Sequence, residues 1–456
     1  MNTDITIIGS GPGGYVAAIR AAQLGADVVL IEKEKIGGVC LNCGCIPTKS
    51  LYRNALFVKD LKNSTHLCVD VDNFKINFQQ MIKRKDNIVN RLAMGVKQLL
   101  KTNGVKVIHG IGSIIDKNKV LVNTGDGEKI INTNNIIIAT GATTVIPPIK
   151  GLEGEGILTS TEMLSLTELP TEIAIIGGGV IGVEFASIFS TFGSKVTIIE
   201  KMANILPEMD NEVSEALKNE LVKKGIAVNT RTELQEVKGE KDKLRLITTG
   251  GELVVDKVLV SVGRKPLLPD INSNVGINIT STGAIEVNSK MQTNVPNIYA
   301  IGDVNGNYQL AHVASAEGIV AVNNIMGKEE EMDYKVVPNV VFSLPEVASV
   351  GLTESKARER TRIKVGTFPY SANGKALSMG EETGFIKVIA DKYLNEILGV
   401  HIFGYDASNL IAEAALGMKL EVTADEVAKT IHAHPTVSEI MMEACQDIDS
   451  KAIHKI

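Results

Sequence analysis

Three cysteines and a lysine lie close together in residues 37–49, which read GGVCLNCGCIPTK. Proline lacks the backbone N–H that the first turn of a helix leaves unpaired, so Pro47 predicts a helix that begins near Cys45. A cysteine at that place faces unpaired N–H groups and the positive end of the helix dipole, and both favour the thiolate. The segment therefore offers a reactive thiol.

Cys40 and Cys45 are five residues apart and are candidates for a redox disulfide. An ideal helix rises ~1.5 Å per residue, which would place the two Cα atoms ~7.5 Å apart. That distance exceeds the ~4.4–6.8 Å found in disulfides, so a bridge requires a tightened turn, which Gly44 permits. Lys49 follows Cys45 by four residues and is expected on the same helical face.

A dinucleotide-binding fingerprint precedes the cysteines. Residues 4–32 read as strand, glycine turn, helix and strand, with glycines in G-x-G-x-x-G order. The first glycine makes the tight turn, the second admits the pyrophosphate, and the third lets the helix pack on the strand; an acid after the second strand accepts a ribose hydroxyl. These residues are Gly9, Gly11, Gly14 and Glu32.

The fingerprint recurs in residues 172–200 as Gly177, Gly179, Gly182 and Glu200. In both copies the acid follows the third glycine by 18 residues. One such motif is a weak signal, and two glycine-rich turns formed by chance are the alternative, but equal spacing in two complete copies argues against chance.

Two dinucleotide sites with a dithiol between them indicate electron transfer. A dithiol passes two electrons and nicotinamide accepts hydride, so a flavin is needed between them. The first fingerprint abuts the disulfide, which predicts FAD there and NAD at the second. The carboxylate of Glu200 favours NAD over NADP, because it would accept the 2′-hydroxyl and repel a 2′-phosphate. No arginine occurs from Gly193 to Thr230 to bind that phosphate, and Lys201 is the only cation nearby.

Composition excludes several classes of protein. A length of 456 residues suggests about three domains, and 44% hydrophobic residues give an ample core. A net charge of −6 without a basic run excludes nucleic acid as a partner. No apolar stretch approaches the ~20 residues of a membrane span, and the first strand leaves no room for a signal peptide. Five cysteines in this length predict a cytoplasmic protein with a catalytic cysteine pair.

The cysteine segment, the paired fingerprints, AIGD at 300–303 and HAHPT at 432–436 together resemble the pyridine nucleotide–disulfide oxidoreductases. The resemblance covers essentially the whole chain. It implies an α/β fold with two Rossmann-like dinucleotide-binding domains and a C-terminal α+β dimerisation domain. The implied domains are FAD-binding at 1–145, NAD-binding at 146–269, a return to the FAD-binding domain at 270–333, and the interface domain at 334–456.

The resemblance also assigns residues around the cofactors. Asp303 matches the acid that meets the flavin ribitol, and Lys49 and Glu184 match the flavin's partner lysine and acid. A plain surface acid is the alternative for Glu184. The remaining cofactor-binding matches are Gly112, Thr140, Gly141, Ala311 and Gly263.

An acid–base pair is expected near the C-terminus. His434 matches the histidine that takes the substrate thiol proton, and Glu439 matches the acid that orients its ring. Only a thiolate attacks a disulfide, and histidine titrates near neutrality. The alternatives are a buried, satisfied His434 and a Glu439 that closes a capping box with Thr436. His432 should point the other way on an extended segment and is expected to be structural.

IPTK at 46–49 and HAH at 432–434 favour the lipoamide branch of the family. That branch implies reoxidation of protein-bound dihydrolipoamide, a homodimer, and lipoyl domains of 2-oxo acid dehydrogenase, acetoin dehydrogenase or glycine-cleavage complexes as partners. Glutathione-type reductases are the alternative within the family. A flavin-bearing protein that has lost turnover is the alternative outside it.

Cys43 departs from the family, which usually carries an aliphatic residue there. A zinc site that includes His66 and Cys68 is the alternative that three close cysteines raise. Zinc sites usually show two C-x₂-C pairs, and zinc leaves both fingerprints unexplained, so no metal is expected. Cys43 is instead a possible competitor in disulfide exchange. Cys68 is expected to be a buried small hydrophobe.

Overall fold

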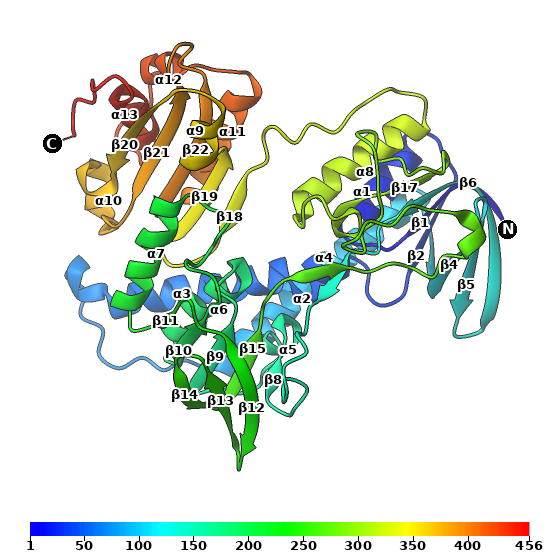
Figure 1. Ribbon diagram of the computed structural model, residues 1–456, viewed down its shortest axis with the longest axis horizontal. Helices are drawn as coiled ribbons and strands as arrows, with labels where there is room; N and C mark the ends of the chain where they lie inside the picture. The colour runs from blue at the N-terminus through cyan, green and yellow to red at the C-terminus, as the bar shows by residue number, and fades with distance from the viewer. Residues whose placement is uncertain (456) are drawn as a thin grey trace. The chain divides into compact units, whose positions relative to one another are not determined.

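The computed structural model describes residues 1–455, and these divide into two compact units (Figure 1). The first unit comprises Met1–Ser50, Gln79–Val145 and Gly263–Asp333. The second comprises Leu51–Phe78, Ile146–Val262 and the chain from Tyr334 onward. The four-part division expected from the sequence stays a prediction; residues 51–78, expected in the FAD-binding domain, group with the second unit.

A seven-stranded sheet forms the centre of the first unit, in the order β3-β2-β1-β6-β5-β4 with β17 paired to β6. Strands β3, β2, β1, β6 and β17 run parallel, whereas β6, β5 and β4 form an antiparallel meander. The parallel strands are Val- and Ile-rich runs, as expected for strands buried on both faces. Their bounds are β1 Asn2–Ile8, β2 Val28–Glu32, β3 Lys106–His109, β4 Ile111–Asp116, β5 Lys119–Thr124, β6 Gly127–Ile138 and β17 Ile298–Ala300.

Helices α1 (Pro12–Gln23) and α8 (Ala311–Ile325) of this unit pack closely because each carries a glycine at the contact. A Cβ added to Gly13 would lie 2.9 Å from the carbonyl oxygen of Ala314, and one added to Gly318 would lie 2.8 Å from that of Gly13. Strand β17 and helix α8 thus complete the first unit from a late part of the sequence. Helix α4 (Phe78–Thr102) is the longest helix described for this unit.

The second unit contains a second parallel sheet, in the order β11-β10-β9-β15-β8, and a three-stranded antiparallel sheet. Its central strand β9 is followed by the second glycine turn and helix α6. The bounds are β8 Ile157–Leu158, β9 Glu172–Ile176, α6 Val180–Phe192, β10 Lys195–Ile199, α7 Asn211–Lys223, β11 Ala227–Asn229, β12 Leu234–Glu240, β13 Lys243–Thr248, β14 Gly251–Val255 and β15 Lys257–Val260.

A five-stranded antiparallel sheet in the order β18-β19-β22-β21-β20 lies in the C-terminal part of the second unit. Helices α11, α12 and α13 contribute apolar side chains to the core that this sheet forms. The bounds are β18 Asn339–Val341, β19 Glu346–Gly351, α9 Glu354–Arg360, β20 Ile363–Pro369, α10 Gly374–Met379, β21 Phe385–Asp391, β22 Ile397–Gly404, α11 Ala407–Lys419, α12 Ala424–Lys429 and α13 Glu439–Asp447. Two doubly wound parts and a C-terminal α+β part confirm the predicted fold class.

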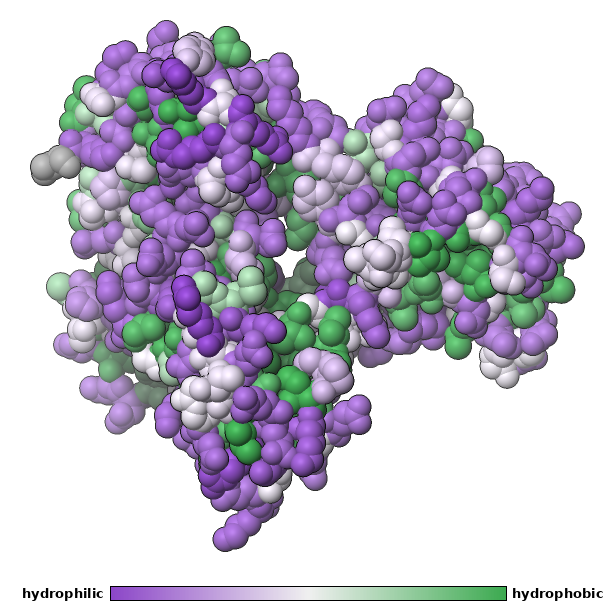
Figure 2. All heavy atoms as spheres, viewed as in Figure 1, coloured by the Kyte–Doolittle hydropathy of each residue, from purple (hydrophilic) through white to green (hydrophobic). Residues whose placement is uncertain are grey.

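The face shown in Figure 2 is mostly hydrophilic, with apolar side chains gathered in several patches. Among the described residues, no helix is long and apolar enough to cross a bilayer. Within residues 1–455, no group of three or more His, Cys, Asp or Glu side chains is arranged to hold a metal ion.

Candidate active site

Cys40 and Cys45 form a disulfide at a break between two helices. One residue separates helix α2 (Gly38–Cys43) from helix α3 (Cys45–Lys62). This break brings the Cα atoms of the two bridged cysteines to 4.7 Å. Gly44 fills the break, where an added Cβ would lie only 3.0 Å from the carbonyl oxygen of Val39. The tightened turn expected from the sequence is confirmed, and Cys45 is the first residue of an 18-residue helix.

The other three cysteines are unbridged. Cys43 is the last residue of α2 and is half-buried. Cys445 is buried, and this burial raises the pKa of its thiol to about 12. Cys68 is exposed, so the expectation that it is buried is wrong. It ends a short 3-10 turn (Ser64–Leu67) and enters a segment without helix or strand, so no element packs over it.

The first glycine turn has the geometry that a dinucleotide requires. Gly9 has a φ of +104°, and a Cβ there would lie 2.3 Å from the carbonyl oxygen of Ala139. A Cβ on Gly14 would lie 1.9 Å from the carbonyl oxygen of Gly9, which explains the close packing of helix on strand. Gly11, at the N-terminus of α1, has nothing within 4 Å of an added Cβ, so its surface is open to a phosphate.

The carboxylate of Glu32 is held at this turn by backbone donors. Its Oε2 accepts a hydrogen bond from Ser10 N at 2.9 Å, and its Oε1 accepts one from Glu34 N at 2.8 Å. The residue is only 6% exposed. The acid is therefore fixed at the end of β2, where the ribose of a bound dinucleotide would lie.

The second glycine turn repeats this geometry. Gly177 also has a φ of +104°, and a Cβ on Gly182 would lie 2.1 Å from its carbonyl oxygen. Gly179, at the N-terminus of α6, is open like Gly11. Glu200 accepts hydrogen bonds from the backbone N–H groups of Gly178 and Met202, each at 2.6 Å. The residues of both turns thus fit a dinucleotide.

Two cations lie close to Glu200. Lys201 is paired with Glu233 at 3.1 Å. Arg231, the residue after Thr230, donates its backbone N–H to the carbonyl oxygen of Met202 at 2.9 Å, and its side chain is exposed. The pairing of β10 with β11 is what brings Arg231 here, so only the sheet register could have revealed it.

Asp303 lies in the 3-10 turn Gly302–Asn305 of the first unit. Its Oδ2 is 3.8 Å from Nε of Arg264, and burial raises the pKa of this carboxyl group although Arg264 opposes the shift. The turn is held by Glu317, which is fully buried and accepts hydrogen bonds from Gly302 N at 2.6 Å and Asn305 Nδ2 at 2.9 Å. Sequence reasoning missed Glu317, because nothing in its own helix marks it.

The other residues predicted to meet the flavin also belong to elements around the first sheet. Thr140 donates its hydroxyl to the carbonyl oxygen of Leu267, and Gly141 after it has a φ of +73°. Gly112 is in β4, where an added Cβ would lie 3.3 Å from Ile8 and Ile31. Ala311 is the first residue of α8, and Lys49 is in the first turns of α3.

Glu184 and Gly263 were predicted to lie at the cofactors as well. Glu184 is on α6, only 4% exposed, and its Oε1 accepts a hydrogen bond from Phe342 N at 3.0 Å. The alternative of a plain surface acid is therefore wrong. Gly263 has a φ of +124°, and its carbonyl oxygen accepts a hydrogen bond from Val145 N at 3.0 Å.

His434 and Glu439 form a hydrogen-bonded pair. Nδ1 of His434 is 2.9 Å from Oε1 of Glu439, and the imidazole is 78% exposed, so the buried alternative is wrong. Oε2 of Glu439 accepts a hydrogen bond from Thr436 N at 2.9 Å, which is half of a capping box. Burial alone would raise the pKa of Glu439, but these hydrogen bonds hold it below its usual range. With Nδ1 occupied, Nε2 is the ring nitrogen that can exchange a proton.

His432 is structural, as expected. Its side chain is 6% exposed, Nε2 lies 2.8 Å from Oε1 of Glu413, and Nδ1 lies 2.9 Å from the carbonyl oxygen of Thr430. Both ring nitrogens are occupied, so His432 cannot take the role of His434. The disulfide belongs to the first unit and the His434–Glu439 pair to the second.

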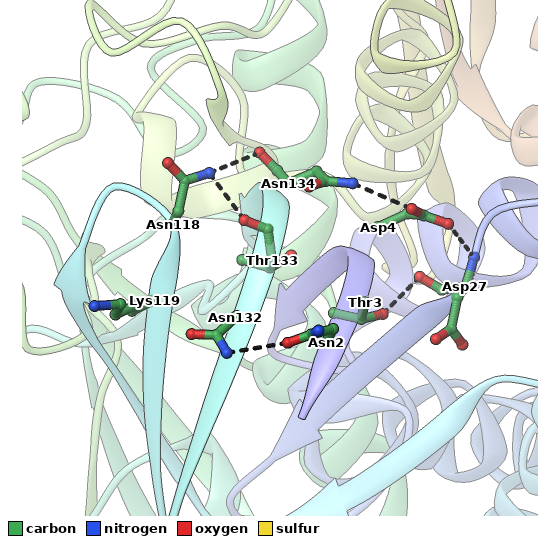
Figure 3. Close-up of a pocket in the computed structure, with 9 residues that line it drawn as sticks. All are labelled: Asn2, Thr3, Asp4, Asp27, Asn118, Lys119, Asn132, Thr133 and Asn134. Carbon is green, nitrogen blue, oxygen red and sulfur yellow. Dashed lines mark hydrogen bonds between the residues drawn. The ribbon is translucent and has the colours of Figure 1, made fainter.

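The first unit also has a polar pocket that does not belong to the predicted dinucleotide site (Figure 3). Its side chains are hydrogen-bonded to one another: Asn132 donates to Asn2, and Asn134 donates to Asp4. Asn2 begins β1, whereas Gly9 follows the other end of the strand, which is about 23 Å away at the rise of a strand. Ligands of parallel sheets bind at the carboxyl ends of the strands, so this pocket lies at the wrong edge for a dinucleotide.

Comparisons with known proteins agree with this geometry. Residues 3–318 match the family described as pyridine nucleotide-disulphide oxidoreductase, and residues 337–445 match its dimerisation domain. The dihydrolipoyl dehydrogenase of Chlamydia trachomatis serovar D is 42% identical over 445 aligned residues, which cover 97% of this chain and 96% of that protein. A dihydrolipoyl dehydrogenase of Bacillus subtilis strain 168 is also 42% identical, with 99% of both chains covered.

Solved structures show the same architecture. The HOCl-induced flavoprotein disulfide reductase RclA of Escherichia coli, in its Cu(II) complex, matches with a TM-score of 0.89 at 30% identity. The match covers 98% of this chain and 99% of that one. The chain therefore belongs to the pyridine nucleotide-disulphide oxidoreductase family, whose members work with FAD and NAD(H).

Proposed function

We propose that the protein reoxidises dihydrolipoamide carried on lipoyl domains and passes the electrons to NAD⁺. The observation that carries this proposal is the Cys40–Cys45 disulfide, in a chain whose full-length relatives are dihydrolipoyl dehydrogenases. We assign FAD to the first glycine turn, because only five residues separate Glu32 from α2, and NAD to the second. Bound FAD supplies a carrier that takes two electrons from a dithiol and releases them as hydride.

The remaining cofactor residues follow from this assignment. Glu32 and Glu200 would hold the two adenosine riboses, and the N-termini of α1 and α6 would bind the two pyrophosphates. Gly263 would lie beside the nicotinamide. We assign to the flavin Lys49, Gly112, Thr140, Gly141, Glu184, Asp303 and Ala311.

His434 starts the reaction as the general base. A thiol with an ordinary pKa near ~8.5 is mostly protonated at neutral pH, so the substrate must lose a proton before it attacks. Nε2 of His434 accepts that proton, while Glu439 stabilises the imidazolium through Nδ1. Glu439 is suited to this role because its lowered pKa keeps it ionised.

The substrate thiolate then attacks Sγ of Cys40 and expels Cys45 as a thiolate. Cys45 is the better leaving group, because the N-terminus of the 18-residue helix α3 stabilises its negative charge. The second substrate sulfur, after losing its proton, attacks the mixed disulfide and closes the lipoamide ring. Cys40 leaves and receives a proton, so the pair has gained the two electrons that the substrate lost.

We further propose that His434 serves the disulfide of the partner subunit in a two-fold dimer. The matched dimerisation domain supports a homodimer. Leu416, Leu420 and Ile431 are 64%, 67% and 96% exposed within it, which are apolar surfaces that a second copy would cover. Lipoyl domains of 2-oxo acid dehydrogenase, acetoin dehydrogenase or glycine-cleavage complexes are the proposed donors, in the cytoplasm.

Anaerobic titration of the purified protein tests this function. We expect one FAD per chain, a yellow colour, and stoichiometric flavin reduction by dihydrolipoamide. NADPH followed by glutathione disulfide should not turn over. Turnover with glutathione disulfide instead would identify a glutathione-type reductase. A colourless protein containing zinc would overturn the assignment of the first glycine turn.

Cofactor preference provides a second test. NAD⁺ should exceed NADP⁺ in kcat/KM by at least about two orders of magnitude, because a 2′-phosphate would place a second negative charge against the buried Glu200. Arg231 is an exposed cation whose backbone lies beside the segment after Glu200, so Arg231→Ala is the comparison variant, and it should not narrow the ratio. Equal use of both cofactors would refute the role given to Glu200.

A further inference from the structure

A lysine is buried in the C-terminal sheet of the second unit. The side chain of Lys387, in β21, is 3% exposed, although lysine is almost never buried unless it is paired. Its Nζ lies 3.0 Å from Oδ1 of Asp210, 3.0 Å from Oε2 of Glu212 and 2.6 Å from Oε2 of Glu354. Burial would lower the pKa of Lys387, but the three carboxylates raise it well above its usual value, so the lysine is charged.

Asp210 is the centre of this cluster. It caps α7, where its Oδ1 also accepts the N–H of Glu212 at 3.2 Å, and its Oδ2 accepts the N–H of Glu354 at 2.9 Å. Helix α7 packs against β22 (Figure 1). His401, opposite Lys387 in the sheet register, is buried with a lowered pKa and contributes no charge. Lys387 is thus the cation that attaches the start of α7 to the C-terminal sheet.

Asp210 also ends the segment that starts at Glu200. Residues 201–209 fold back over the second glycine turn: Leu206 N donates to the carbonyl oxygen of Gly178 at 2.9 Å. Ile205 packs there too, since a Cβ on Gly178 would lie 2.8 Å from it. Leu206 has a φ of +47°. A residue other than glycine holds this left-handed conformation only where the surrounding structure stabilises it. Hydrogen bonds to Met202 and Gly178 fix Glu200 at one end, and Lys387 fixes Asp210 at the other.

We propose that Lys387 is a positioning residue for the dinucleotide at the second glycine turn. By holding Asp210, it keeps residues 201–209 folded against Gly178, so that Glu200 and the turn are in place before the cofactor arrives. This proposal rests on the proposed function only in taking NAD as the occupant of that turn. Without the Lys387–Asp210 ion pair, whichever partner is removed, residues 201–209 lose their attachment to the C-terminal sheet.

The test is Lys387→Met in the full-length, FAD-loaded protein, since methionine keeps the chain length and removes the charge. We expect the Kd of NAD⁺, measured by calorimetry, to rise about tenfold, within the range of such indirect couplings. Trypsin should cut faster after Lys201, and saturating NAD⁺ should slow the cut. Anaerobic flavin reduction by dihydrolipoamide should keep its wild-type rate, because that half-reaction does not use the second turn.

Two variants make the comparison specific. Lys364→Met is the matched control, because Lys364 is in strand β20 of the same sheet but pairs with Asp449 at 2.8 Å; it should leave the Kd unchanged. Asp210→Asn keeps a capping side chain and removes the charge, and should reproduce the rise even if Lys387→Met does not fold. An unchanged Kd in Asp210→Asn, or in a folded Lys387→Met, would overturn the proposal. Wild-type protein that binds no NAD⁺ would overturn the proposed function as well.

Discussion

Cys45→Ser is expected to lower dihydrolipoamide oxidation by roughly three orders of magnitude or more, while FAD stays bound. The disulfide cannot form without Cys45, so the substrate thiolate has no bond to attack at Cys40. Under the proposed assignment, the flavin is bound by the glycine turn around Gly9 and does not need this sulfur. The measurement is steady-state turnover with dihydrolipoamide and NAD⁺, together with the visible absorbance spectrum of the bound flavin.

Substitutions at the two neighbouring cysteines show which sulfur atoms form the catalytic pair. Cys40→Ser should lose turnover equally, yet leave Cys45 as a thiolate at the start of α3, detected as a long-wavelength charge-transfer band. Cys43→Ser is the matched control, since Cys43 is unbridged, and should be nearly neutral. If Cys43→Ser loses as much activity as Cys45→Ser, then the catalytic pair has been assigned wrongly.

Mixed dimers should recover activity that neither parent has. His434→Gln removes the base and should by itself cost about two to four orders of magnitude. When a Cys45→Ser chain pairs with a His434→Gln chain, one of the two composite sites is doubly defective, and the other combines an intact disulfide with an intact histidine. The heterodimer should therefore show about half the wild-type activity, because a two-fold interface creates two equivalent sites.

Differently tagged chains allow the heterodimer to be isolated and its composition checked before the assay. The two mutant homodimers, mixed without subunit exchange, are the control and should stay inactive. A verified heterodimer without activity would mean that base and disulfide come from the same chain, and the proposed composite site would be refuted.

The parts of the site that depend on local geometry could be predicted from the sequence. Gly9 and Gly177 need a positive φ, and the third glycine of each motif needs a close approach, so spacing alone determines both turns. The break at Gly44 was also predictable from local geometry. Five residues of regular helix hold two cysteines too far apart for a disulfide, so the helix must be interrupted between them. The pairing of His434 with Glu439 is also local, since five residues separate them.

Contacts between separate helices, strands and turns could not be predicted in this way. Glu317 holds the Asp303 turn from a helix, and Arg231 reaches Met202 through sheet pairing. Lys387 meets Asp210 across 177 residues of sequence. Each partner looks like an ordinary charged residue in its own segment. Cys68 was predicted to be buried and is exposed. A small hydrophobic side chain is buried only where another element packs on it, which its own segment does not reveal.

The late return of the chain to its first sheet bears on how the protein is synthesised. Strand β17 pairs with β6 across more than 150 residues, and α8 packs on α1 across about 300. A ribosome has therefore made the whole second glycine turn and its sheet before the first unit can close. Until then α1 lacks the helix that packs on it, and the turn that carries Asp303 has not formed. If the flavin occupies the Gly9 turn as proposed, we expect it to bind only after β17 and α8 have been made. The apolar edge of β6 that β17 covers stays unpaired until then.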